Sequence, residues 1–119
     1  MSNTSGLHST QITTMNEARK ELLEQVYSSF GTVRYIVDEF SNTFKSEISF
    51  DYDKMIIEIK GSDVTTDINN NITLCFEDAL KKLYNDNKIT EELYDKCMIN
   101  VSMLFDVVFN YNKTIIVKI

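Results

Sequence analysis

Residue types that carry reaction chemistry are scarce in this sequence. It contains one histidine, three glycines, two cysteines, and no proline or tryptophan. A general base must be held within hydrogen-bond reach of its target, but His8 lies in the small, polar stretch 1–12, which we expect to be a flexible tail. The glycines, Gly6, Gly31 and Gly61, are too scattered to form a phosphate-cradling loop. These shortages argue against an enzyme.

The two cysteines, Cys75 and Cys97, are too few for the disulfide framework of a small secreted protein. Each falls at an apolar position of a predicted helix. A zinc site needs four nitrogen or sulfur ligands, and the chain has a single histidine and no C-x-x-C motif. We expect two reduced, buried thiols packed as small hydrophobic groups, with a redox pair or a nucleophile as the alternative. No metal and no cofactor is predicted.

The carboxylates are numerous but form no recognisable site. Residues 63–67 begin and end with aspartate but lack the alternating oxygen ligands and central glycine of an EF-hand loop. The formal net charge of −6 disfavours direct binding to nucleic acid, which needs clustered lysine and arginine. Solvated acidic surface explains most of these residues, and a face complementary to a basic partner is the alternative.

Long apolar runs are also missing. No run approaches the ~20 residues of a membrane-spanning helix, and residues 1–14 lack the hydrophobic segment of a signal peptide. We therefore expect a cytoplasmic protein, in its own cell or in a host cell. Asparagine, isoleucine and lysine are plentiful, which is typical of an A/T-rich genome.

The dominant feature that is present is a helical apolar pattern over residues 14–44, with steps of three and four. Thr14 and Glu17 have the spacing of a capping box. One helix of that length would measure ~45 Å, which is longer than so small a domain is expected to be wide. Its apolar face would then pair with a second copy near residues 27–35. The alternative is a break at Gly31, where the helix folds back on itself.

From Glu47 to Lys60 the apolar residues alternate with polar ones, which predicts a β-hairpin with turn-forming residues at 51–54. Residues 114–119 alternate as well and predict a short strand. Because an isolated two-stranded hairpin is marginally stable, we expect this strand to pair with the hairpin.

Helical spacing returns over residues 66–86, and Thr90 is placed to cap a further helix that continues through Phe109. The run 101–109 is apolar enough for a strand to be the alternative. Residues 80–96 resemble the short helical hairpin (SHOCT-type) of many bacterial and phage proteins, although the usual turn glycine is absent. The resemblance implies a helix–turn–helix hairpin and no activity.

Together these patterns predict an α+β fold with one domain over residues 13–119. A long N-terminal helix, a β-hairpin, a helical hairpin and a C-terminal strand would form a small antiparallel sheet covered by helices. We expect a small, acidic, non-enzymatic interaction protein, and we favour a phage or mobile-element inhibitor that covers the basic, nucleic-acid-binding surface of a host defence protein. The alternative is a self-associating assembly or adaptor protein, a homodimer formed through the long helix. The candidate interface residues are Tyr27, Phe30, Arg34, Tyr35, Asp38, Glu39 and Tyr52.

Overall fold

A computed structural model describes residues 16–44, 46–61, 67–111 and 113–119. The fold is α+β, as predicted. The predicted tail over residues 1–12 and the predicted cap at Thr14 lie outside the described residues. Within them, the elements in order are a helix over residues 16–26, α2 (Phe30–Phe44), β1 (Glu47–Asp51), β2 (Ile56–Lys60), α3 (Ile68–Asn85), α4 (Glu91–Ile99), the 3-10 helix η1 (Val101–Met103), β3 (Asp106–Tyr111) and β4 (Thr114–Lys118).

The four strands form one antiparallel sheet in the order β1-β2-β4-β3. The predicted hairpin and its pairing with the C-terminal strand are both confirmed, because β4 lies between β2 and β3. At the hairpin turn, Asp51 Oδ1 accepts hydrogen bonds from the backbone N–H groups of Asp53 and Lys54, at 3.0 and 3.1 Å. This is the local contact by which aspartate favours turns.

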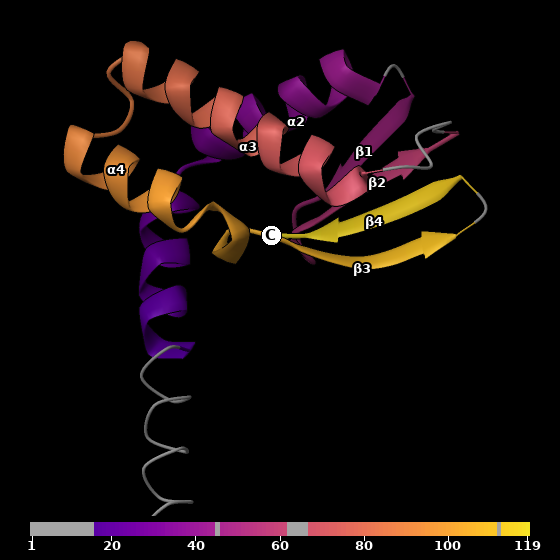
Figure 1. The fold of residues 1–119 in the computed structure, drawn as a ribbon, viewed down its shortest axis with the longest axis horizontal. Helices are drawn as coiled ribbons and strands as arrows, with labels where there is room; N and C mark the ends of the chain where they lie inside the picture. Colours follow the sequence, from indigo (N-terminus) through magenta and orange to yellow (C-terminus); the bar gives the residue numbers. More distant parts are fainter. Residues whose placement is uncertain (1–15, 45, 62–66, 112) are drawn as a thin grey trace, which may run out of the picture.

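Helices α2 and α3 cover one face of the sheet, and α4 returns alongside α3 (Figure 1). The core lies between these two layers. Its fully buried members come from both, and they include Phe40, Phe76, Ile57, Ile59, Ile115 and Val117. In the sheet, the alternation of apolar residues in β2 and β4 turns Ile57, Ile59, Ile115 and Val117 toward the helices.

The segment 14–44 is not one helix. The helix over residues 16–26 ends in a turn at Tyr27–Ser29, and α2 begins at Phe30 in a new direction (Figure 1). The Ser29 hydroxyl oxygen accepts a hydrogen bond from the Gly31 N–H at 3.1 Å, so Ser29 caps the new helix. The alternative prediction of a broken helix is therefore confirmed, but the break lies at residues 27–29 and Gly31 is in the first turn of α2. A Cβ atom at residue 31 would approach this hydroxyl to 3.3 Å, so glycine leaves room for the cap.

From Leu22 onward the apolar stripe of the described residues is covered or partly covered by the chain itself, although the start of the first helix extends beyond the other elements (Figure 1). Leu22 and Val26 of the first helix and Val33, Ile36 and Phe40 of α2 are all buried within the chain. The argument for a dimer, which depended on an uncovered stripe, is therefore lost, although self-association itself stays a prediction.

The predicted helix through Phe109 is wrong in its second half. Helix α4 ends at Ile99, η1 makes one turn, and the chain then extends into β3. The alternative, a strand within 101–109, is correct from Asp106 onward. Leu104 and Phe105 are buried at the transition. Both a helix and a short buried strand are compatible with so apolar a run, and pairing with β4 decides between them.

The helical hairpin implied by residues 80–96 is confirmed. Helix α3 ends at Asn85, Asn87 adopts a left-handed conformation with φ of 60°, and α4 starts after Thr90. The Thr90 hydroxyl accepts a hydrogen bond from the Leu93 N–H at 3.2 Å, as the predicted cap requires. Asparagine tolerates the left-handed conformation, which explains why the turn forms without glycine.

Candidate interaction surfaces

The sheet has a second face, which points away from α2 and α3. Cross-strand partners share a face, so the residues that alternate with the buried ones define this side. We call it the open face. None of its residues is buried. They are Glu47, Ser49, Asp51, Ile56, Glu58, Lys60, Asp106, Phe109, Tyr111, Thr114, Ile116 and Lys118.

A β-bulge in β3 determines which side chains reach the open face. Pairing steps from Val107 opposite Val117 to Phe109 opposite Ile116, and Val108 is left over. Regular alternation from Val107 would place residue 109 on the helix-covered side. The extra residue instead turns Phe109 and Tyr111 outward, and bulges commonly re-aim side chains in this way. Their ring centroids lie 6.3 Å apart in an edge-on arrangement.

Three neighbouring side chains of β3 form the most exposed apolar group on the sheet. Val108, Phe109 and Tyr111 are 56%, 44% and 64% exposed. Together they make up three of the seven large, exposed hydrophobic residues in the described part of the chain. Ile116, the cross-strand partner of Phe109, is half-buried beside it. We call Phe109, Tyr111 and Ile116 the apolar cluster. Contiguous exposed apolar groups are typical of interaction sites.

The other half of the open face is acidic. Glu47 and Asp51 lie on β1, and Glu58 lies on β2, where its Oε1 is 3.4 Å from Lys60 Nζ. Three carboxylates against one ammonium group leave a formal charge of −2 on the β1–β2 half of the face. The open face therefore has an acidic half and an apolar half, side by side.

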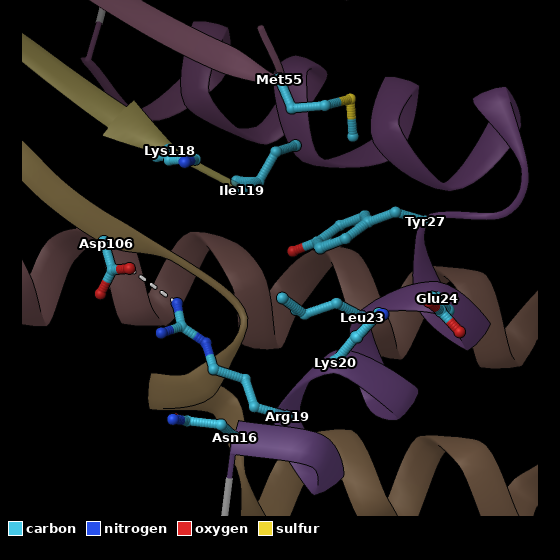
Figure 2. A pocket seen from close by; sticks show the side chains of 10 residues that line it. All are labelled: Asn16, Arg19, Lys20, Leu23, Glu24, Tyr27, Met55, Asp106, Lys118 and Ile119. Atoms are coloured by element: carbon cyan, nitrogen blue, oxygen red, sulfur yellow. Dashed lines mark hydrogen bonds and ion pairs between the residues drawn. The ribbon is translucent and has the colours of Figure 1, made fainter. Parts of the chain in front are cut away.

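A groove of about 460 Å³ lies where the first helix meets the end of the sheet. Figure 2 shows Leu23, Tyr27 and Ile119 pointing into it. Arg19 crosses the groove, with Nη2 2.7 Å from Asp106 Oδ2 and Nε donating to the Met103 carbonyl at 3.1 Å. Both ends of the guanidinium are thus engaged within the chain. The lining contains no cysteine, serine, threonine or histidine, and its other charged side chains are Lys20, Glu24 and Lys118.

A second groove, of about 600 Å³, runs between the start of α3 and β3 on the helix-covered side. Asp106 is the one charged residue in its lining. Ile68 and Thr73 line the α3 side, and Val107 and Asn110 line the β3 side. Apart from Asp106, the groove offers apolar and neutral polar contacts.

The predicted interface residues do not form a single surface. Tyr27 is half-buried, and its hydroxyl donates a hydrogen bond to the Leu104 carbonyl at 2.7 Å. Burial raises the pKa of Tyr27 well above its usual value. The Tyr35 hydroxyl donates to Asp86 Oδ2 at 2.6 Å, and this bond raises the pKa of Tyr35. Both tyrosines therefore join segments within the chain.

Glu39 is also committed internally. Its side chain is only 9% exposed and its carboxylate pairs with Lys82 of α3, and the hydrogen bond from Lys82 to Glu39 raises the pKa of the lysine. Arg34 and Asp38 are exposed on α2. The ion pair between Glu39 and Lys82 joins α2 to α3, so Glu39 stabilises the fold.

The remaining predicted residues lie near the hairpin or at the start of α2. Tyr52 is 47% exposed in the hairpin turn and packs edge-on against Phe50, with ring centroids 4.5 Å apart. Tyr52 and Tyr27 line one small hollow together, so the structure does bring these two together. Phe30 begins α2, and its side chain lies outside the description.

The two cysteines are free and buried, as predicted. Burial raises the pKa of Cys97 to about 11 and also raises the pKa of Cys75. The Cys75 thiol lies 3.9 Å from the Glu39 carbonyl oxygen, to which it donates. A buried thiol with a raised pKa is a poor nucleophile, because the thiolate is the reactive form. Within the described ranges, no group of three or more histidine, cysteine or carboxylate side chains could hold a metal ion.

Sequence reasoning missed the apolar cluster. A signal existed, because the β-forming residues 107–109 precede a turn at 110–113 and a second strand-like run, which together resemble a hairpin. The bulge had no such signal. Which face Phe109 and Tyr111 occupy depends on the single unpaired residue Val108, which composition and periodicity do not reveal.

Comparisons with known proteins add no relative. No family model matches the chain, and neither a curated protein nor a solved structure matches it. Among the helices of the described residues, none has the length and apolar character needed to cross a membrane.

Proposed function

We propose that this chain is a small, acidic, non-enzymatic interaction protein that covers a basic surface of another protein. The instance we favour is a phage or mobile-element inhibitor of a host defence protein. Its support is the formal net charge of −6 and the A/T-biased composition. An acidic surface speeds encounter with a basic partner and disfavours acidic competitors.

The observation that carries the proposal is the outward turn of Phe109 and Tyr111 at the β3 bulge. Burying a large apolar side chain contributes roughly 1.5–3 kcal/mol, so leaving two aromatic rings in water forgoes stability that a partner can recover. Tyrosine and phenylalanine are enriched at the centres of protein interfaces. A docking surface on the open face accounts for both rings together with the acidic residues beside them.

Neither groove has a cysteine or a histidine in its lining, which favours binding over catalysis. The described thiols are buried, and the arginine in the first groove is hydrogen-bonded within the chain through Nε and Nη2. An enzyme would need a nucleophile, acid or base placed toward a cavity.

The proposal is tested by affinity capture from a lysate of the host cell, with the wild-type protein and Tyr111→Ser compared side by side. We expect a protein that the wild type retains, that Tyr111→Ser loses, and whose recovery falls as salt is raised, because ionic attraction is screened.

Ile99→Ser is the matched control. Ile99 is 82% exposed on α4, away from the open face, so its substitution removes a comparable apolar side chain. Retention of the same proteins by Tyr111→Ser and by the wild type would contradict the proposed docking surface.

Self-association is a second candidate function. A comparison of the two edge strands of the sheet, β1 and β3, favours β3 as the place where it would occur. Edge strand β1 carries a carboxylate at each end, Glu47 and Asp51, whereas β3 has Asp106 alone and three exposed apolar residues. Charges protect sheet edges against pairing, so β3 is the less protected edge. A dimer formed there would be reduced to a monomer by Val108→Lys. Arg34→Glu on α2 would leave its mass unchanged in light scattering.

A further inference from the structure

We infer that the open face binds a basic amphipathic helix of the partner protein, with the apolar stripe of that helix on the apolar cluster and its lysine or arginine residues over β1 and β2. This inference rests on the proposed function and specifies the chemistry of the partner segment. It follows from how the two halves of the face are arranged.

The spacing of the strands sets the scale of the contact. Neighbouring strands lie ~4.8 Å apart, so β1 and β3, three spacings apart, are separated by roughly 14 Å. A helix with its side chains is ~10–12 Å wide. One helix lying on the face can therefore contact the apolar cluster on β3 and β4 while its flanking side chains extend over β2 and β1.

The acids on the β1–β2 half are placed to receive those flanking side chains. Glu47 is exposed at one end of β1, and Asp51 is exposed at the other, next to the turn. Asp51 uses one oxygen, Oδ1, for the turn, which leaves Oδ2 for a partner. Glu58 already neutralises Lys60. The surplus charge of −2 on this half thus favours a cationic flank.

The β3–β4 half of the open face is suited to bind the apolar stripe of the partner helix. Phe109 contacts Tyr111, and Ile116 lies beside Phe109 on the neighbouring strand, so the cluster spans two strands. Asp106 on this half is already paired with Arg19 at 2.7 Å. The β3–β4 half therefore presents apolar contacts and one further charge, the exposed Lys118, which lies opposite Asp106 at the other end of the strands from Tyr111. An acidic amphipathic helix and nucleic acid would both meet repulsion from the carboxylates of the β1–β2 half.

The experiment uses two synthetic 18-residue helical peptides with the same leucine stripe. One carries lysine on its polar face, and the other carries glutamate. Each is titrated into isotope-labelled full-length protein at about 0.15 M salt, with amide chemical shifts as the readout. We expect the lysine peptide to bind at least about tenfold more tightly than the glutamate peptide. The shifts should concentrate on β3, β4 and β1.

Two charge reversals separate local recognition from general attraction. Glu47→Lys and Asp95→Lys change the net charge equally, but Asp95 is exposed on α4, outside the open face. Glu47→Lys should weaken lysine-peptide binding at least about threefold more than Asp95→Lys. Equal weakening by the two variants, equal affinity of the two peptides, or shifts confined to the helices would each overturn the inference.

The test also separates this inference from the proposed function. If Tyr111→Ser abolishes capture of the host protein while the lysine peptide does not map to the open face, the proposed function stands and the helix inference is wrong. If the wild-type protein without any partner has the mass of a dimer in light scattering, and Tyr111→Ser has the mass of a monomer, a second copy covers the face. That result would overturn the inference.

Discussion

Ser29 stands at the junction between the first helix and α2, and its hydroxyl caps the second of them. We expect Ser29→Ala to lower the free energy of unfolding by about 1 kcal/mol, because the N–H of Gly31 loses its acceptor. Ser28→Ala is the control, since the exposed Ser28 hydroxyl donates only to the Gln25 carbonyl at 3.2 Å. Urea unfolding of both variants measures the difference. Equal destabilisation would mean that the Ser29 cap does not stabilise the junction.

The thiol of Cys97 makes stability depend on alkaline pH. Burial raises its pKa from 9.0 to about 11 in the folded protein. Below pH 9 the thiol is neutral in both states, but between pH 9 and 11 the unfolded chain releases the proton first. Stability should therefore fall as pH rises through this window, by on the order of 1–2 kcal/mol from this group.

Urea unfolding at pH 8, 9.5 and 10.5 measures the effect. Cys97→Ala removes the thiol and should show a shallower fall over the same range, with the contribution of Tyr27 still present because burial also raises the pKa of that phenol. Parallel pH profiles for the wild type and Cys97→Ala would contradict the assignment.

Individual side chains differ in how far the sequence predicts their roles. Cys75 and Cys97 were predicted to be buried because they continue the apolar stripes of their own helices. Glu39 was predicted to be exposed at an interface, yet it is buried against Lys82, 43 positions along the chain. A long-range ion pair leaves no trace in local periodicity, so the sequence could not indicate it.

At the scale of elements, β4 holds the sheet together because it pairs with β2 on one side and β3 on the other. Its buried residue Ile115 is 1% exposed. Ile115→Ala should cost about 2–5 kcal/mol of unfolding free energy through lost burial and the cavity left behind. Ile116→Ala, on the opposite face of the same strand, should cost about 1 kcal/mol or less.

Thermal or urea unfolding of the two variants gives the comparison. Similar losses for both would mean that the open face is covered as well as the helix side. Removing residues 114–119 altogether should abolish cooperative unfolding, since both neighbouring strands would lose their partner.

The sequence predicts well those elements in which the apolar residues follow a single spacing and a recognisable turn or cap residue marks one end. The hairpin over residues 47–60 alternates along β1 and from Ile57 along β2 and turns at Asp51, and α4 starts at its Thr90 cap. β3 was ambiguous because valine and phenylalanine at 107–109 suit a buried helix or a strand equally. Its identity is set by pairing with β4, a contact that local sequence does not specify.

For the whole molecule, the change of chain direction at Tyr27–Ser29 matters most (Figure 1). It places the second half of the first helix against the core, where Leu22 and Val26 are buried, so the reason to expect a second copy along residues 27–35 no longer applies. Three neighbouring large hydrophobic residues are exposed on β3, and the others in the described chain are dispersed over the helices and the hairpin turn. Helix length and apolar content indicated a surplus of hydrophobic surface, but only the three-dimensional arrangement shows the group on β3.

The unpaired position of Val108 has a consequence for how the chain tolerates changes in length. Deleting Val108 leaves the partner of every other β3 residue unchanged, so the shortened protein should fold and still bind through Phe109 and Tyr111. Deleting Asn110 instead would move Tyr111 opposite Ile115 and turn its ring toward α3. Partner capture with the two deletion variants should distinguish them. Loss of binding on deletion of Val108 would show that the bulge itself, and not only the outward direction of the rings, is required. Natural variants of this protein should accordingly differ by one residue at position 108 more readily than at position 110.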